Sequence, residues 1–281
     1  MKKNKNDKIT KLIIIIFFSF IYEYKYYLQF ISFLDTESNL KIFIVTHKDF
    51  INYRHNPAYT IVADNKYQLK NKYNLSIIYA DKGKLYKLRN CYSEMSKLYY
   101  IYELYKKGII RSKYVGLNHY RRYFIFKDNI PNLDNIFKEY DIILNTPLFY
   151  KPGMKKHFCK FNSCRHYNEI IDIIKTIRPE YYKAAIKTMN LKRIFICNLF
   201  IMKKDDFLKF CEFIFDVLFE FDKRHNFTSD EDVLNYFKKI YNNSEDLYYQ
   251  YRIQGFLSER LGNIFYYKNF KKIKIYSFGY F

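Results

Sequence analysis

Apolar residues along this chain recur with two different periods, which predict strands and helices in turn. Short apolar runs rich in β-branched residues predict buried strands at 41–46, 113–117, 141–145 and 193–203. Apolar residues at helical spacing predict helices that begin at Asn90, His166, Pro179, Asp205 or Asp206, Ser229 and Gly255. Because helices and strands alternate, we expect an α/β fold with a mostly parallel sheet flanked by helices.

Local signals set several element boundaries. We expect Asn90 to cap a helix that Gly108 ends, Pro179 to occupy a first helical position, and Ser229 with Asp232 to form a capping box. Residues 52–87 are predicted to be loops and short elements of uncertain type. In the helix at 255–262, the apolar side chains should pack inward, while Glu259 and Arg260 stay polar.

The first 40 residues form an extension that differs from the predicted domain at 41–281. Five lysines precede the ten-residue run 12–21, as in the charged and hydrophobic regions of a signal sequence. This run is about half of the roughly 20 residues that a membrane helix needs, and no small-residue cleavage site follows. Two interpretations stay open: a weak or peripheral membrane anchor, and an extension unrelated to the fold.

The strong positive charge is weak evidence for nucleic-acid or membrane-surface binding. The 281 residues include 49 Lys and Arg against 28 Asp and Glu, a net charge of +21, which is typical of nucleic-acid or membrane-surface binding. The lysines are spread throughout, with no long basic run or RNA-recognition signature. A noncatalytic nucleic-acid- or glycan-binding protein with a basic, aromatic surface is the alternative to an enzyme, and we do not expect nucleic acid as a partner.

The five cysteines predict neither a disulfide framework nor a metal centre. Their odd number and irregular spacing favour a reducing compartment and a cytoplasmic protein. One cluster has the ligand types of zinc, with His157, Cys159, Cys164 and His166 within ten residues. The spacing matches no common zinc pattern, so we expect a loop with incidental cysteines.

The segment 114–124 changes abruptly from an apolar strand to polar and cationic side chains. Asn118, His119, Arg121 and Arg122 follow the predicted strand at its carboxyl end, where open α/β sheets bind ligands. Two arginines and a histidine there favour an anionic group such as a diphosphate. An ordinary solvated loop is the alternative. If the strand continues, Arg121 and Arg122 face opposite sides.

Asn198 lies at the centre of the apolar run 193–203, which lacks alternation and so predicts a strand covered on both faces. A buried amide needs hydrogen-bond partners. Asn198 therefore either satisfies the neighbouring backbone or faces a ligand.

Several segments resemble one family in the same order. They are similar to the glycosyltransferase-like proteins of polysaccharide and capsule biosynthesis known as domain of unknown function 4422, which are related to GT-A glycosyltransferases. The matching segments are 42–48, 90–95, 114–124, 198–203 and 255–261, and the string Gly-Leu-Asn-His-Tyr-Arg-Arg-Tyr is the most specific. The resemblance implies a GT-A-like, Rossmann-like fold. It also implies transfer of a sugar from a nucleotide-sugar donor to a polysaccharide or related glycan acceptor, at the inner face of the membrane.

The same resemblance suggests roles for individual residues. Donor and diphosphate binding would fall to Thr46, His47, Asn90, Asn118, Arg121 and Arg122. The catalytic candidates are His119, Glu94 and Glu259, and the candidates for acceptor or sugar contact are His166, Asn198 and Arg252. Structural alternatives accompany them: Glu94 suits the first turn of a helix, Glu259 has Arg260 and Arg252 as ion-pair partners, and His119 suits a hydrogen-bonded core position.

Dependence on a divalent metal stays open. A departing nucleoside diphosphate needs a metal ion or fixed cationic donors. In many GT-A enzymes an Asp-x-Asp motif follows the strand that resembles 113–118, yet carboxylates are missing there. The literal Asp-x-Asp, at residues 230–232, is better explained as a helix start. His119, Arg121 and Arg122 are therefore candidates for a fixed cationic site.

Overall fold

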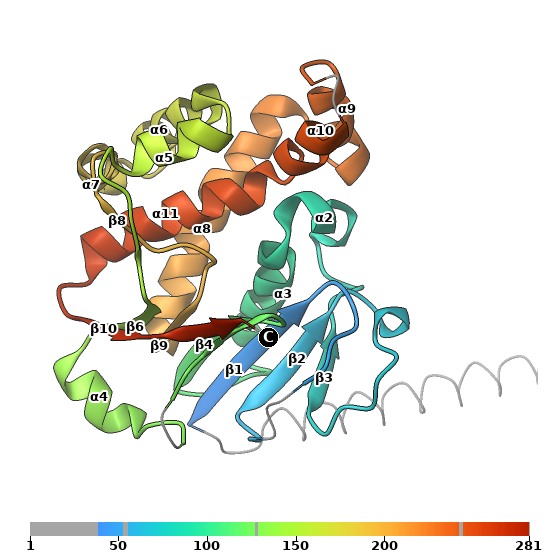
Figure 1. Ribbon diagram of the computed structural model, residues 1–281, viewed down its shortest axis with the longest axis vertical. Coiled ribbons are helices and arrows are strands. Elements are labelled where there is room, and N and C mark those ends of the chain that lie inside the picture. The colour runs from blue at the N-terminus through green and yellow to red at the C-terminus, as the bar shows by residue number, and fades with distance from the viewer. Residues whose placement is uncertain (1–38, 53–55, 127–128, 242–243, 281) are drawn as a thin grey trace, which may run out of the picture.

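The computed structural model describes residues 39–52, 56–126, 129–241 and 244–280 (Figure 1). The predicted extension at 1–40 lies almost wholly outside the described residues, so its role as an anchor stays a prediction. None of the helices within these ranges is both long and apolar enough to cross a membrane.

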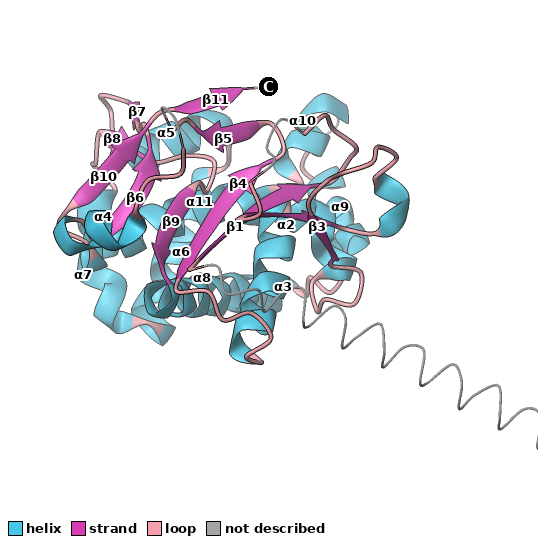
Figure 2. Cartoon of the chain, turned by 90° about the horizontal axis from the view of Figure 1, so that it is seen from below, coloured by secondary structure: helices cyan, strands magenta, loops and turns pink. Residues whose placement is uncertain are grey.

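Nine strands among the described residues form one sheet, seen from below in Figure 2. Seven follow the order β10 (Ile273–Tyr276), β6 (Ile142–Asn145), β9 (Phe200–Lys203), β4 (Tyr114–His119), β1 (Leu40–Thr46), β2 (Tyr59–Ala63) and β3 (Ser76–Tyr79). At the carboxyl end of β4, β5 (Arg122–Phe124) pairs with β4, and β5 also pairs with β11 (Phe278–Tyr280). The other neighbours are parallel, except that β9 is antiparallel to both β4 and β6. The predicted α/β fold with a mostly parallel sheet is confirmed.

The central strands are apolar because both of their faces are covered. Every residue of β1 is buried. Phe43 and Val45 point to one core, while Ile42 and Ile44 point to the other, as the alternation of a strand requires. The strands β2 and β3 lie inside the stretch 52–87, whose pattern had left the element type open.

Three long helices cover one face of the sheet (Figure 1). They are α3 (Glu94–Lys106), α8 (Lys204–His225) and α11 (Ile253–Asn269). Further helices pack around them: α2 (Arg89–Tyr92), α5 (Met154–Phe161), α6 (Cys164–Ile177), α7 (Tyr182–Thr188), α9 (Asp230–Lys238) and α10 (Ser244–Gln250). The opposite face carries α4 (Leu133–Glu139), whose Leu133 and Phe137 join the second core. Three short 3-10 helices, η1 (Lys66–Gln68), η2 (Tyr86–Leu88) and η3 (Pro179–Tyr181), and a two-stranded pair, β7 (Leu148–Phe149) with β8 (Arg193–Ile194), complete the elements.

Several predicted helix boundaries are confirmed. Gly108 follows α3 with a φ of +68°, a conformation that favours glycine. Pro179 opens η3, which runs directly into α7. Ser229 and Asp232 form the reciprocal hydrogen bonds of a capping box at α9.

Other boundaries differ from the prediction: α6 begins at Cys164 and α11 covers Ile253–Asn269. Asp205 and Asp206 lie in the first turn of α8 and do not cap it, because Lys203 is the cap residue. The run 193–203 is not one strand: it splits into β8 and β9, since Cys197 and Asn198 both have positive φ. A strand cannot continue through such residues.

Candidate active site

The polar segment after β4 forms a tight hairpin. β4 ends at His119, the chain turns at Tyr120 and Arg121, and β5 begins at Arg122, which pairs with His119. Directly opposed residues of an antiparallel pair project from the same face, so His119 and Arg122 are neighbours. Arg121 is exposed at the turn, and Arg122 is half-buried. The strand does not continue through the two arginines, because the chain reverses at Tyr120 and Arg121.

Glu94 is presented by a break between two helices. The predicted single helix from Asn90 is interrupted at Ser93, whose φ of 54° and ψ of −124° are rare for serine. The backbone of α11 closes on this break at Gly255, where an added Cβ would lie 3.1 Å from Ser93 Oγ. The break makes Glu94 the first residue of α3, with its side chain only partly buried. Strain of this kind clusters at functional sites.

Asn198 reaches the same edge of the sheet because β9 is antiparallel. Leu117 pairs with Phe200, and continuing this register places Asn198 beside His119. The Asn198 amide nitrogen donates to Glu94 Oε1 at 2.8 Å and to Ser258 Oγ at 3.0 Å. Asn198 is 5% exposed, so the amide is held inside the protein between α3 and α11.

Glu259 is engaged through both of its carboxylate oxygens. Oε1 accepts the Cys197 N–H at 2.8 Å, and Oε2 accepts from Arg260 Nη1 at 3.2 Å. Burial raises the pKa of Glu259, while the Arg260 charge and the Cys197 N–H oppose this rise. The predicted pairing with Arg260 is confirmed. Arg260 was expected to stay polar on the helix surface, yet it is only 3% exposed.

His119 lies near Glu94 and the two hairpin arginines. Its Nε2 is 3.9 Å from Glu94 Oε1. Burial lowers the pKa of His119, the Glu94 charge opposes this, and the Arg122 charge lowers the pKa further. The imidazole is therefore neutral at pH 7 and available as a hydrogen-bonding group.

Cationic side chains gather around Tyr120, at the edge of the sheet where β1 and β4 end. Around the Tyr120 ring lie Lys48 at 5.6 Å and Arg121 at 5.2 Å, and the His47 ring packs edge-on to it at 5.2 Å. Arg252, just before α11, donates to Ser93 Oγ at 3.1 Å and lies close enough for its charge to act on His47. We call His47, Lys48, Arg121 and Arg252 the cationic rim; all four are exposed. Lys48, Arg121 and Arg252 carry its charge, because desolvation and the nearby Lys97 lower the pKa of His47.

Two predicted donor-binding residues are buried next to the rim. Thr46 is 2% exposed, and its hydroxyl bonds the backbone of Lys48, which shapes the turn after β1. Asn118 is fully buried, and alternation along β4 directs it to the face opposite His119. Neither polar atom of its amide has a hydrogen-bond partner in the described part of the chain. The structure therefore does not place Asn118 with the cluster.

Asn90 and the Asp-x-Asp sequence belong to helix ends. Asn90 does not cap a helix, because α2 begins at Arg89. Its backbone N–H and side-chain amide both donate to Asp230, and Cys91 N–H does so at 3.1 Å. Asp232 serves the capping box of α9. Both aspartates are thus occupied at helix starts, and the described residues contain no group of three or more His, Cys, Asp or Glu suited to a metal ion.

His166 lies apart from the other candidates. It is 2% exposed on α6, where its Nε2 and Tyr236 Oη are 3.1 Å apart and its ring packs on Phe221 and Phe237. Burial lowers the pKa of His166 to about 4. Its contacts are to α8 and α9, so the structure does not bring it together with Glu94 or Asn198.

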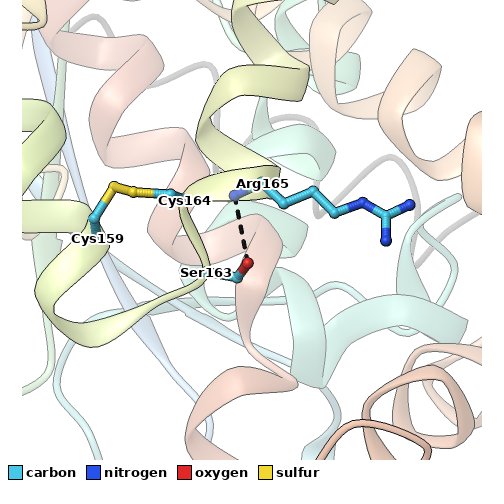
Figure 3. Close-up of a disulfide and its surroundings, with 4 residues drawn as sticks. All are labelled: Cys159, Ser163, Cys164 and Arg165. Atoms are coloured by element: carbon cyan, nitrogen blue, oxygen red, sulfur yellow. Dashed lines mark hydrogen bonds between the residues drawn. A yellow bond between two sulfur atoms is a disulfide. The ribbon is translucent and has the colours of Figure 1, made fainter.

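The neighbouring cysteines are paired, contrary to the expectation of incidental cysteines. Cys159 of α5 and Cys164 of α6 form a disulfide with Cα atoms 4.8 Å apart (Figure 3). The other three, Cys91, Cys197 and Cys211, are buried and free. The chain reverses between α5 and α6, which brings the pair together. His157, the remaining member of the zinc-like set, accepts from Arg260 Nη2 at 3.2 Å.

The sequence pattern did not predict the burial of Arg260, the contact of Ser258 with Asn198 or the break at Ser93. Arg260 carried a signal, since it lies three residues after Leu257 and four before Ile264, inside the apolar stripe of α11. Ser258 and the break at Ser93 had no comparable signal. Residue 93 is a serine, not the glycine or proline that would signal a helix break in the sequence. The break is maintained by the packing of α11 against it, which the local sequence does not reveal.

Comparisons with known proteins agree with this architecture. No curated protein matches the sequence. The apo structure of WbbM, described as a bifunctional glycosyltransferase, is similar in fold, with a TM-score of 0.64 and 20% sequence identity. The match covers 86% of this chain and 45% of that chain, so this chain spans less than half the length of WbbM. The model of domain of unknown function 4422 matches residues 41–270, and the chain therefore belongs to the DUF4422 family.

Proposed function

We propose that the protein is a glycosyltransferase that moves a sugar from a nucleotide-sugar donor to a hydroxyl of a polysaccharide or related glycan. The observation that carries the proposal is that a partly held carboxylate, Glu94, directly follows Ser93, which Arg252 of the cationic rim contacts, at the edge of the sheet where β1 and β4 end. The fold shared with WbbM and the family membership support it.

The rim suits the diphosphate of the donor. A leaving nucleoside diphosphate gains negative charge, which fixed cations stabilise. Arg121 and Arg252 can each offer forked donors to phosphate oxygens, and His47 and Lys48 add further donors nearby. Arg122 lies deeper, next to His119, where its charge acts on Glu259 as well.

Glu94 is the better candidate for the general base. Its Oε1 is held by Asn198, while Oε2 has no hydrogen-bond partner among the described residues. In a direct displacement, the acceptor hydroxyl loses its proton to Glu94 as its oxygen bonds to the anomeric carbon. The bond from that carbon to the diphosphate oxygen breaks, and the diphosphate leaves against the rim.

We also propose that residues 1–40 hold the domain at 41–281 against the inner face of the membrane. The lysine-rich start and the apolar run that follows are suited to peripheral contact. This part of the proposal rests on the sequence pattern alone.

The test uses the full chain and a panel of nucleotide sugars. Donor binding is measured by calorimetry and turnover by release of nucleoside diphosphate, each with and without a divalent ion. We expect Arg121→Ala with Arg122→Ala to weaken donor binding by roughly 10- to 100-fold for each arginine that binds a phosphate oxygen. Arg111→Ala is the matched control, since Arg111 is equally exposed but precedes the opposite end of β4.

Two results would overturn the proposal. One is a folded double variant that binds and turns over the donor as the unaltered protein does. The other is tight, strongly salt-dependent nucleic-acid binding with no response to any nucleotide sugar, which would favour the noncatalytic alternative.

A further inference from the structure

We infer that Glu259 is a positioning residue: together with Arg260 it holds the Cys197–Asn198 turn, and this turn aims the Asn198 amide at Glu94. The inference rests on the proposed function, because it assigns the base role to Glu94 and removes it from Glu259.

The Cys197–Asn198 turn needs support from outside itself. Cys197 has a φ of 72° and Asn198 a φ of 50°. Asparagine tolerates the left-handed region, but cysteine rarely adopts it, so surrounding contacts must maintain the turn.

One face of α11 supplies this support at two points. Glu259 accepts the Cys197 N–H at 2.8 Å. One helical turn later, Asn263 accepts the Phe195 N–H at 2.9 Å and donates to the Phe195 carbonyl at 2.7 Å. Glu259 and Asn263 are four residues apart and lie on the same face of α11, so this face holds the backbone before β9 at both Phe195 and Cys197.

Arg260 in turn fixes Glu259. Its guanidinium donates to Glu259 Oε2 and to His157 Nδ1, both at 3.2 Å, and lies over the Phe158 ring at 5.7 Å. A side chain bonded in this way has little freedom to rotate. Both Glu259 oxygens already accept hydrogen bonds, whereas Glu94 accepts one only through Oε1 among the described residues.

Asn198 transmits the position of the turn to Glu94. Its two amide hydrogens account for the bonds to Glu94 and Ser258, and Ser258 donates its own hydrogen to Gly255 O at 2.6 Å. Because both hydrogens are committed, the amide nitrogen orients Glu94 and does not bind sugar. The role expected for Asn198 as a sugar contact therefore becomes a positioning role.

The test compares four substitutions in the full chain. Glu94→Gln should lower kcat by about 10²- to 10⁴-fold, the usual loss of a general base. Glu259→Gln loses the bond from Arg260, because an amide NH2 cannot accept it, but its carbonyl still accepts the Cys197 N–H, so kcat should stay within about tenfold of the unaltered protein. Glu259→Ala loses both bonds and should fall at least tenfold further. Donor KM should change little in each. Glu139→Gln, at an exposed glutamate of α4, is the control.

A second pair of variants separates the backbone from the amide. Asn198→Gly keeps a residue that accepts positive φ but lacks the amide, so kcat should fall while thermal stability stays near that of the unaltered protein. Asn198→Ala should lower both kcat and thermal stability, because alanine lacks the amide and rarely adopts a positive φ. This pair decides the question if the Glu259 variants fail to fold.

Hydrogen exchange at the 195–199 segment gives a readout that needs no turnover. The Cys197 amide should exchange faster in Glu259→Ala but not in Glu259→Gln. If the unaltered protein turns over no donor, the proposed function fails. Hydrogen exchange still tests whether Glu259 holds the Cys197–Asn198 turn. A folded Glu259→Gln variant as inactive as Glu94→Gln, or unchanged Cys197 exchange in Glu259→Ala, would overturn the inference.

Discussion

A buried carboxyl behind the site should make the stability of the protein depend on pH between about 4 and 6. Asp222 of α8 is 5% exposed and accepts hydrogen bonds from Tyr92 Oη at 2.6 Å and Gln254 Nε2 at 2.8 Å. These partners directly precede Ser93 and Gly255, so Asp222 ties together the segments that form the break. Burial raises the pKa of Asp222 from 3.8 to about 6, against the opposing effect of both hydrogen bonds.

The sign and size of the effect follow from proton linkage. The folded protein holds this proton more tightly than the unfolded chain does, so protonation of Asp222 stabilises the fold. The contribution is fully present below pH 3.8 and is lost as the pH rises through about 6. At roughly 1.4 kcal/mol for each pH unit between these values, it amounts to about 3 kcal/mol.

The Asp222→Asn variant tests this reasoning. The asparagine stays neutral, and rotation of the Tyr92 hydroxyl lets its amide be bonded, so the fold should persist. Urea unfolding at closely spaced pH values from 4 to 7 gives the free energy of unfolding of both proteins. The difference between the two should change by about 3 kcal/mol across this range, with the variant gaining relative stability as pH rises. Parallel curves for the two proteins would refute the assignment of this titration to Asp222.

Three further substitutions test the packing around the site, each measured as a change in the free energy of unfolding. Gly116→Ala should cost about 1–3 kcal/mol, because the added Cβ would lie 2.9 Å from Ile42 Cγ1. If the variant is as stable as the unaltered protein, the side chains around Gly116 rearrange at little cost and the reasoning is wrong. Lys97→Met should cost roughly 3–5 kcal/mol at pH 7, since it strands Asp64, its buried partner at 2.5 Å, and the added change Asp64→Leu should recover much of the loss. If the double variant is no better than the single one, the pair is not coupled. Joint replacement of Cys159 and Cys164 by serine should cost only ~2 kcal/mol, because the disulfide closes a five-residue separation, and a thiol reductant should then leave the variant unaffected.

Patterns within single elements were enough to predict much of the architecture. The β-branched run at 41–46, the stop at Gly108 and the capping box at Ser229 are local features whose physical causes lie within a few residues. The change of character after β4 likewise located His119, Arg121 and Arg122 correctly at a sheet edge. The outcome was different where a neighbour far along the chain decides the conformation. Asp230 takes over the capping of α2, and α11 supports both the break at Ser93 and the turn at Cys197.

The sequence by itself determined that this chain forms an α/β sheet with cations at the carboxyl end of a buried strand, because hydrophobic period and strand polarity are properties of contiguous residues. Only the tertiary structure decided which hydrogen bonds each of the two candidate carboxylates accepts. Glu94 and Glu259 cannot be told apart from the sequence pattern, but they accept different hydrogen bonds. Asn198 donates to Glu94 from 104 residues away, whereas Glu259 accepts from Cys197, 62 residues away, and from the adjacent Arg260. Such contacts depend on the antiparallel placement of β9 beside β4 and on the packing of α11, neither of which leaves a periodic signal in the chain.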